Sequence, residues 1–174
     1  MLRLLARALL KGPMTEAAPE ADREGLAELA RKLKGAAQTR LGRSLAIREV
    51  DAGSCNGCEL EIHALNNPIY DIERFGIRFV ASPRHADVLL VTGPVTHNMA
   101  VALERTWRAT PGPKWVVAMG DCAIDGGCFA GSYAVVGGVD KVVPVDLRIK
   151  GCPPRPVEIL AGLLALLETV EGKR

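Results

Sequence analysis

Four of the five cysteines in this chain have the chemistry and the spacing of a ligand set for a metal ion or an iron-sulfur cluster. Cys55 and Cys58 form a Cys-Asn-Gly-Cys pair, and Cys122 and Cys152 follow 64 and 94 residues after Cys58. Thiolates scattered this widely can meet only when the whole domain folds. Each lies within two residues of a glycine, which lets the backbone approach a bulky inorganic group. The sequence therefore predicts one four-thiolate site assembled from distant loops.

The spacing favours an iron-sulfur cluster, although three kinds of site use such thiolates. Structural zinc usually takes two short Cys-x-x-Cys pairs, whereas this chain has one. A proline follows Cys152, as in the cysteine-proline runs of bacterial ferredoxins. A redox-active dithiol at Cys55 and Cys58 is the third alternative, because Cys-x-x-Cys at a strand-to-helix turn is typical of thioredoxin-like sites. That alternative leaves Cys122 and Cys152 without a role.

The fifth cysteine, Cys128, is interpreted as a packing residue rather than a substitute ligand, because a free cysteine most often behaves as a small buried hydrophobic residue. An odd number of cysteines argues against a disulfide framework and for a reducing compartment. Arg7 interrupts the leucines near the N-terminus, so we recognise no export signal there. We expect a cytoplasmic protein.

Composition predicts an aliphatic α/β core. The 174 residues fit one domain, with 48% hydrophobic but only 4% aromatic residues. Such a balance suits a sheet that is covered on both faces. The net charge of +2 gives no case for nucleic acid as a partner.

An N-terminal extension is predicted over residues 1–44, before a cluster-binding domain over residues 45–174. Residues 1–50 hold ten Lys and Arg against six Asp and Glu, or +4, so the remainder carries −2. The extension comprises a cationic, leucine-rich leader at 1–11, a linker at 14–21 and a helix near 22–37. The leader could lie on a membrane surface or a partner, or be an ordinary frayed helix start. No apolar run approaches the roughly 18 residues of a membrane-spanning helix, so membrane association should be peripheral.

From residue 45 onward, short apolar runs alternate with helical stretches, which predicts a doubly wound and mainly parallel sheet with helices on both faces. Strands are expected at 45–50, 77–80, 87–92, 114–119 and 141–145, and helices at 59–66, 97–109 and 154–170. Ligands collect at the carboxyl ends of the strands in such sheets. Cys55, Cys122 and Cys152 follow the first, fourth and fifth strands, so their loops should meet at one edge.

Five segments carry a family resemblance that covers about residues 47–166. They are Ser54-Cys55-Asn56-Gly57-Cys58-Glu59-Leu60-Glu61-Ile62, Ser82-Pro83-Arg84-His85-Ala86-Asp87, Thr92-Gly93-Pro94-Val95-Thr96, Gly120-Asp121-Cys122-Ala123 with Gly126-Gly127, and Gly151-Cys152-Pro153-Pro154-Arg155-Pro156. Together they resemble the small, cluster-carrying subunit of membrane-bound group 4 nickel-iron hydrogenases such as formate hydrogenlyase. They are also similar to the homologous B subunit of respiratory complex I, an NADH-quinone oxidoreductase. The resemblance implies a flavodoxin-like fold and one 4Fe-4S cluster on Cys55, Cys58, Cys122 and Cys152.

One departure from the complex I pattern points toward the hydrogenase branch. Complex I B subunits have two adjacent cysteines where this chain has Cys55 and Cys58 separated by two residues. The resemblance then implies a nickel-iron large subunit, a ferredoxin-like iron-sulfur subunit and integral membrane subunits as partners, with this chain peripheral on the cytoplasmic side of the cell membrane. Its role would be electron transfer without a catalytic centre of its own. The alternatives are a complex I-type subunit that passes electrons to quinone and, from another class, a zinc-stabilised assembly scaffold or a thiol oxidoreductase.

Three residues near the predicted site are candidates for proton transfer or for tuning of the cluster: Glu61, His63 and Arg84. Glu61 matches a glutamate that follows the cysteine pair in the family and lies on the first turn of the predicted helix, where capping is the alternative role. His63 could carry a proton or donate to a cluster sulfur, with a structural role as its alternative. Arg84, like Arg74, could stabilise the more negative reduced cluster or be ordinary surface charge.

Other polar residues receive simpler interpretations. Glu59 is expected at the solvent or at an interface, and His97 is expected to cap a helix. His85, like His63, could carry a proton or donate to a cluster sulfur, with a structural role as its alternative. The glycine-rich stretch 136–139 lacks the lysine and hydroxyl of a phosphate loop and is interpreted as a turn. Nothing resembles a Ser-His-Asp set or paired catalytic carboxylates, so no catalytic residue is predicted.

Overall fold

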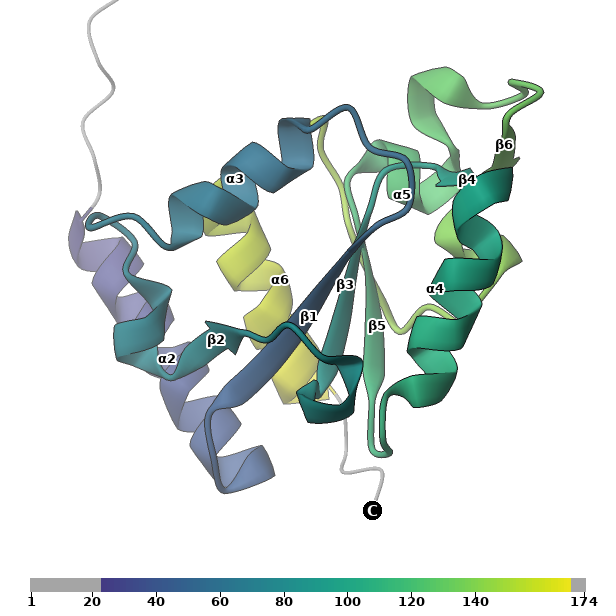
Figure 1. Ribbon diagram of the computed structural model, residues 1–174. Helices are drawn as coiled ribbons and strands as arrows, with labels where there is room; N and C mark the ends of the chain where they lie inside the picture. The colour runs from purple at the N-terminus through teal and green to yellow at the C-terminus, as the bar shows by residue number, and fades with distance from the viewer. Residues whose placement is uncertain (1–22, 170–174) are drawn as a thin grey trace, which may run out of the picture.

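The computed structural model describes residues 23–169, which form a five-stranded parallel sheet between two layers of helices (Figure 1). The strands of this sheet are β1 (Leu45–Asp51), β2 (Ile77–Phe79), β3 (Val88–Thr92), β5 (Trp115–Met119) and β7 (Leu147–Ile149). They lie in the order β2-β1-β3-β5-β7, with every neighbouring pair parallel. Counted within the sheet, this is the 2-1-3-4-5 order of flavodoxin-like folds. The predicted fold class is confirmed.

Two apolar clusters fill the space on either side of the sheet, because successive residues of a strand point to opposite faces. In β3, Val88 and Leu90 belong to the first cluster, whereas Leu89 and Val91 belong to the second. The first cluster is covered by α2 (Arg23–Leu41), α3 (Gly57–Leu65) and α6 (Pro156–Thr169), and the second by α4 (His97–Ala109) and α5 (Asp121–Asp125). Both faces are therefore buried, which explains the continuous apolar runs in the central strands.

Short elements complete the described part of the chain, and most of them were not predicted. They are the 3₁₀ turns η1 (Ile72–Phe75), η2 (Pro83–His85), η3 (Gly127–Phe129) and η4 (Val139–Lys141), and the strands β4 (Val95–Thr96) and β6 (Val135–Gly137). Strands β4 and β6 pair antiparallel in a separate two-stranded sheet. The turn predicted at 136–139 is therefore wrong for its first two residues, which belong to β6.

The strand predicted at 141–145 is wrong. That apolar run follows η4 as a loop, and Val143 packs into the second cluster from there. Pro144 has no amide hydrogen for a strand ladder. The fifth strand of the sheet is instead β7, a short edge strand whose exposed Arg148 forms an ion pair with Asp140 at 3.3 Å.

The helix predicted near residues 22–37 is confirmed as α2, which continues to Leu41. Its side chains Leu33 and Ala37 are buried in the first cluster, beside α6. The leader at 1–11 and the linker at 14–21 lie outside the described residues, and the division at residue 44 remains a prediction. Among helices of residues 23–169, none has the length and apolar character needed to cross a membrane.

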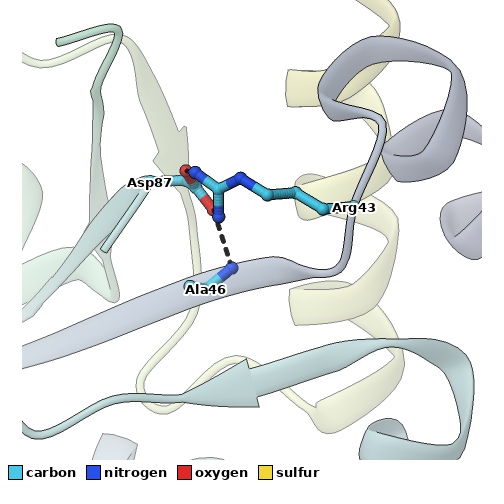
Figure 2. A network of polar contacts seen from close by, with 3 residues as sticks. All are labelled: Arg43, Ala46 and Asp87. Atoms are coloured by element: carbon cyan, nitrogen blue, oxygen red, sulfur yellow. Dashed lines mark hydrogen bonds and ion pairs between the residues drawn. The ribbon is translucent and has the colours of Figure 1, made fainter. Parts of the chain in front are cut away.

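A charged network fixes the amino edge of the sheet, where β3 begins (Figure 2). The Asp87 side chain is 4% exposed, and the two terminal nitrogens of Arg43 donate to its oxygens at 3.1 and 2.5 Å. The backbone N–H of Ala46 donates to the same carboxylate at 3.0 Å. Asp87 thus ties the loop before β1 to the start of β3, which gives this acid of the Ser82 to Asp87 motif a structural role.

Candidate metal centre

The four predicted ligand cysteines converge on one small cavity at the carboxyl edge of the sheet. Cys55 follows β1, Cys122 follows β5 in α5, and Cys152 follows β7, and these strands are parallel. Cys58 lies in the first turn of α3. The cavity has a volume of about 100 Å³ and is lined by Ser54, Cys55, Cys58, Gly93, Asp121, Cys122, Gly151, Cys152 and Pro153. The parallel topology puts these loops on one side of the sheet, and the loops and the start of α3 then bring together thiols that are far apart in the sequence.

A tight turn orients the Cys55 to Cys58 loop. The carboxylate of Asp51 accepts hydrogen bonds from the backbone N–H groups of Gly53 and Ser54, at 2.8 and 2.7 Å. Asn56 adopts the left-handed conformation, with φ 74°, and its N–H donates to Ser54 Oγ at 2.9 Å. Helix α3 begins immediately afterwards at Gly57, two residues earlier than predicted. This turn directs Cys58 toward β5, where its sulfur lies 3.9 Å from the Met119 carbonyl oxygen.

The loops that carry Cys122 and Cys152 are bonded directly to each other. The Gly120 N–H donates to the Ile149 carbonyl at 2.8 Å, and the Asp121 N–H donates to the Gly151 carbonyl at 2.9 Å. The Asp121 carboxylate accepts in return from the Gly151 N–H at 2.9 Å. These bonds continue the β5 and β7 ladder past the ends of the strands and fix the relative positions of the two cysteines.

Two glycines are required by the close approach of the backbone to the sulfurs of Cys58 and Cys122. A Cβ atom at Gly120 would lie 2.8 Å from Cys58 Sγ, and one at Gly127 would lie 2.8 Å from Cys122 Sγ. Both glycines also have positive φ angles, +87° and +51°, which side chains rarely tolerate. The site is thus a cradle in which added carbon atoms would displace the thiols.

Burial and crowding raise the pKa of two thiols of the site, those of Cys58 and Cys122. Burial raises the pKa of Cys58 to about 12, with further contributions from Glu59 and from the other three cysteines. Burial, followed by the neighbouring Cys128 and Cys152, raises the pKa of Cys122 to about 11. Thiolates gathered this closely repel one another unless a positively charged group lies among them. A cluster of iron ions would supply that charge, so the donor set and the cradle fit an iron-sulfur cluster.

Within residues 23–169, no group of three or more His, Cys, Asp or Glu side chains is arranged to hold a single metal ion.

Cys128 is not the buried packing residue that was predicted. It lies in η3 and is exposed to solvent. Cys128 contributes to the raised pKa of the neighbouring Cys122 thiol. The positive φ angles of Gly126 and Gly127 fold the chain back onto Cys122 at this point, and the sequence pattern gave no sign of that contact.

The prediction that Glu59 lies at the solvent or an interface is wrong in its first part, since its side chain is 8% exposed. Ser54 Oγ donates a short hydrogen bond to Glu59 Oε2, while Glu59 Oε1 has no hydrogen-bond partner among the described residues. Glu59 occupies the third position of α3, where the helix dipole favours a carboxylate. Glu61 is the fifth residue of the helix and lies past the unpaired amides that a cap would satisfy. It is half-buried, and His63 is exposed.

Arg84 and His85 lie away from the cysteines, whereas Arg74 and His97 belong to other turns and helices. The turn η2, with Arg84 and His85, connects Phe79 to Val88, and both flanking residues pair with Ile47 in the first half of β1. These side chains therefore lie toward the amino end of the sheet. Arg74, in η1, stacks on Phe75 at 4.9 Å and forms an ion pair with Asp71 at 3.5 Å. The expected cap at His97 is also incorrect, because Thr96 occupies the cap position and His97 is the first residue of α4.

Glu49 is an acid near the site that sequence reasoning missed. It lies half-buried on β1, and burial followed by repulsion from Glu59 raises its pKa, partly offset by His63. Three of the four residues at 48–51 are charged, which indicates a partly polar strand end. It does not reveal that α3 will cover Glu49.

The raised pKa of Glu49 predicts that Glu49→Gln stabilises the protein at pH 7. The folded state holds the Glu49 proton more tightly than the unfolded state does. The contribution of protonated Glu49 to stability is therefore complete below about pH 4.3, the pKa of the unfolded state, and is lost as the pH rises through the folded pKa. Thermal unfolding under anaerobic conditions should show a higher midpoint for Glu49→Gln at pH 7, and the gap should narrow as the pH is lowered. Glu73→Gln, at an exposed position, is the control. A lower midpoint for Glu49→Gln at pH 7 would contradict this interpretation.

Comparisons with known proteins place these features in a family. The family model of the NADH ubiquinone oxidoreductase 20 Kd subunit matches residues 55–166. Formate hydrogenlyase subunit 7 of Escherichia coli is 47% identical over 141 residues, which make up 81% of this chain and 55% of that protein. An NADH-quinone oxidoreductase subunit of Heliobacterium modesticaldum is 48% identical over 116 residues, or 66% of each protein. This chain thus spans about half the length of the formate hydrogenlyase subunit.

A solved structure agrees with these relatives. A chain of the membrane-bound sulfane sulfur reductase, an archaeal respiratory membrane complex, matches with a TM-score of 0.67 and 36% identity, over 83% of this chain and 77% of that one. The resemblance read from the motifs is confirmed. Because the matched region covers most of the chain and contains all four cysteines of the cavity, the chain belongs to the family of the NADH ubiquinone oxidoreductase 20 Kd subunit.

Proposed function

We propose that this chain is an electron-transfer subunit that carries one 4Fe-4S cluster on Cys55, Cys58, Cys122 and Cys152. The observation that supports this most strongly is the single cavity lined by all four thiols. A bound cluster of this type supplies reversible one-electron transfer, while the protein supplies position and electrostatic environment. The family is that of subunits in oxidoreductase complexes, which agrees with such a role.

The residues around the cavity would hold the ligands without taking part in bond chemistry. Asp51 and Asp121 fix the loops through backbone N–H groups, so the thiols are positioned before a cluster binds. Gly120 and Gly127 leave the space beside two ligand sulfurs free. Cys58 is half-buried beside β5, where its sulfur lies 3.9 Å from the Met119 carbonyl oxygen. Glu59 holds Ser54 and thereby the turn before Cys55.

The proposed electron path runs between iron-sulfur partner subunits and the nickel-iron site of a hydrogenase large subunit. Cys55 and Cys152 are exposed at the edge of the sheet, and the apolar side chains Leu60 and Val157, five residues further along the chain from each, are also exposed. This edge is where we place the large subunit, next to the Cys55 to Glu61 loop. The separated cysteine pair and the similarity to a formate hydrogenlyase subunit favour this partner.

The wider assembly is proposed on the same grounds. A ferredoxin-like iron-sulfur subunit would exchange electrons with this chain, and integral membrane subunits would hold it peripherally on the cytoplasmic side. Glu61 and His63, both on α3 after Cys58, are proposed to transfer protons or tune the cluster, which would make its potential depend on pH. Arg84 could act on the cluster only through long-range charge, because η2 enters β3 at its amino end.

Reduction by hydrogen tests the proposed direction of electron flow. The assembly would be purified from membranes without air and exposed to H₂, with the reduced cluster detected by electron paramagnetic resonance. We expect H₂ to reduce the cluster in the assembly but not in the separated chain, because hydrogen must be split by the large subunit. A cluster that is reduced by a quinol analogue and not by H₂ would favour the complex I-type alternative. Recovery of the native chain as a redox-active monomer without a large subunit would contradict the subunit proposal.

A further inference from the structure

The hydroxyl of Ser54 lies at the cysteine cavity, but its hydrogen bonds are made with other groups. Ser54 carries the only hydroxyl among the described residues that line the cavity. Its Oγ donates to Glu59 Oε2 and accepts from the backbone N–H of Asn56 at 2.9 Å. A hydroxyl has one proton to donate, so the proton bonded to Glu59 is not available to a cysteine sulfur. The Glu59 carboxylate therefore determines the direction of the Ser54 O–H.

Neither partner of this hydrogen bond can easily turn away from the other. Glu59 lies on the buried face of α3, and its side chain is 8% exposed. The Ser54 N–H donates to the Asp51 carboxylate at 2.7 Å. On the other side of the turn, a Cβ atom at Gly93 would lie 2.5 Å from Ser54 Cα. The backbone of Ser54 is therefore held between the end of β1 and the residues that follow β3.

One oxygen of the Glu59 carboxylate remains unpaired. Glu59 Oε1 is buried, and no described residue donates a hydrogen bond to it. A buried polar atom without a partner destabilises the folded protein, and a redox or catalytic role is one of the reasons for which such an atom is retained. Packing alone does not explain an acid at this position, because an apolar side chain would fill similar space without that cost.

We propose that Glu59 is a positioning residue: it accepts the hydrogen bond of the Ser54 hydroxyl, keeps that hydroxyl from donating to a ligand sulfur, and so holds the reduction potential of the cluster low. The inference rests on the proposed cluster, because Glu59 acts on it through Ser54. Hydrogen bonds to the sulfurs are among the factors that set the potential of an iron-sulfur cluster. A donor favours the reduced cluster, because reduction adds negative charge to the sulfurs.

A double-mutant cycle of reduction potentials tests the proposal. The wild-type protein, Glu59→Leu, Ser54→Ala and the double variant would each be purified without air in the intact assembly, analysed for iron and acid-labile sulfide, and titrated by electron paramagnetic resonance. Glu59→Leu frees the hydroxyl proton and also removes the carboxylate, so we expect a more positive midpoint potential. In the Ser54→Ala background the same change frees no hydroxyl, and we expect a smaller positive shift. The difference between the two shifts measures the effect of the freed hydroxyl.

Glu59→Gln is the matched control, because its amide oxygen can still accept the Ser54 proton. We expect Glu59→Gln to shift the midpoint potential equally with and without the Ser54 hydroxyl. Equal shifts for Glu59→Leu in the two backgrounds, with full iron content, would overturn the proposal while leaving the cluster assignment intact. A wild-type protein without iron would instead refute the proposed function on which this inference rests.

Deuterium exchange gives a second test that requires no change at Glu59. Pulsed paramagnetic resonance of the reduced cluster in D₂O detects exchangeable hydrogens that are bonded to its sulfurs. We expect Ser54→Ala to leave the strongly coupled deuteron signals of the wild-type protein unchanged, because the Ser54 O–H is directed to Glu59. A strong coupling that disappears in Ser54→Ala would mean that the hydroxyl already donates to the cluster. That result would overturn the proposal even if Glu59→Leu failed to bind iron.

Discussion

Replacing any one of Cys55, Cys58, Cys122 or Cys152 with alanine should abolish the cluster signal, whereas Cys128→Ala should retain it. Changes to groups that merely orient a metal ligand typically cost about 10–100-fold in metal affinity, so the loss of a ligand should cost more than about 100-fold. Because binding of the metal group is coupled to folding, the ligand variants should also unfold at a lower temperature. Iron analysis and electron paramagnetic resonance of dithionite-reduced, anaerobic samples measure the effect.

Cys128→Ala is the matched control, since it removes an exposed thiol without changing a residue that lines the cavity. A ligand variant that kept both full iron content and an unchanged spectrum would remove that cysteine from the assignment. Parallel loss of iron in the control would mean that the cluster uses Cys128.

Gly120→Ala should lower the iron content strongly even though it alters no ligand. Gly120 has φ 87° and ψ 156°, a region that is essentially restricted to glycine, and a side chain there costs about 1–3 kcal/mol. The added Cβ would also lie 2.8 Å from Cys58 Sγ and 3.3 Å from the Gly151 carbonyl oxygen. Cys58 or the Cys152 loop must therefore move. Denaturant unfolding and iron analysis of the same preparation would separate the two effects.

Gly131→Ala is the control variant that measures the cost of a side chain at a positive φ angle without a close contact. Gly131 has a similar φ of +80°, but nothing lies within 4 Å of the position of its Cβ. We expect Gly131→Ala to lose stability while keeping its iron. Wild-type iron content in Gly120→Ala would mean that the close approach to Cys58 is unimportant for the site.

The central strands and the meeting of the four cysteines could be predicted from the sequence for one physical reason. A parallel sheet buried on both faces needs continuous apolar runs, which 87–92 and 114–119 provide. The carboxyl ends of parallel strands lie on one edge, so the loops after β1, β5 and β7 lie at the same edge of the sheet. The apolar pattern wrongly predicted a strand at 141–145. The valines of this run lie in a loop and pack into the second cluster.

The surroundings of the cysteines could not be predicted, because they depend on tertiary contacts. Glu59 is buried with Ile62 and Leu65 at a spacing of three on α3, and its partner Ser54 comes from the preceding turn. A charged residue is rarely buried without such a partner, so burial was not the expected outcome. Cys128 lies close to Cys122 because Gly126 and Gly127, both with positive φ angles, turn the chain between them.

Metal and sulfide analysis of the wild-type assembly, purified without air, determines whether this chain carries a 4Fe-4S cluster. The assembly contains other metal centres under our proposal, so Mössbauer or paramagnetic resonance spectra should be compared with those of the separated chain. Our account predicts about four irons and four sulfides bound to this chain, as a cluster held by four cysteines requires. A chain that contains zinc and no iron would contradict it.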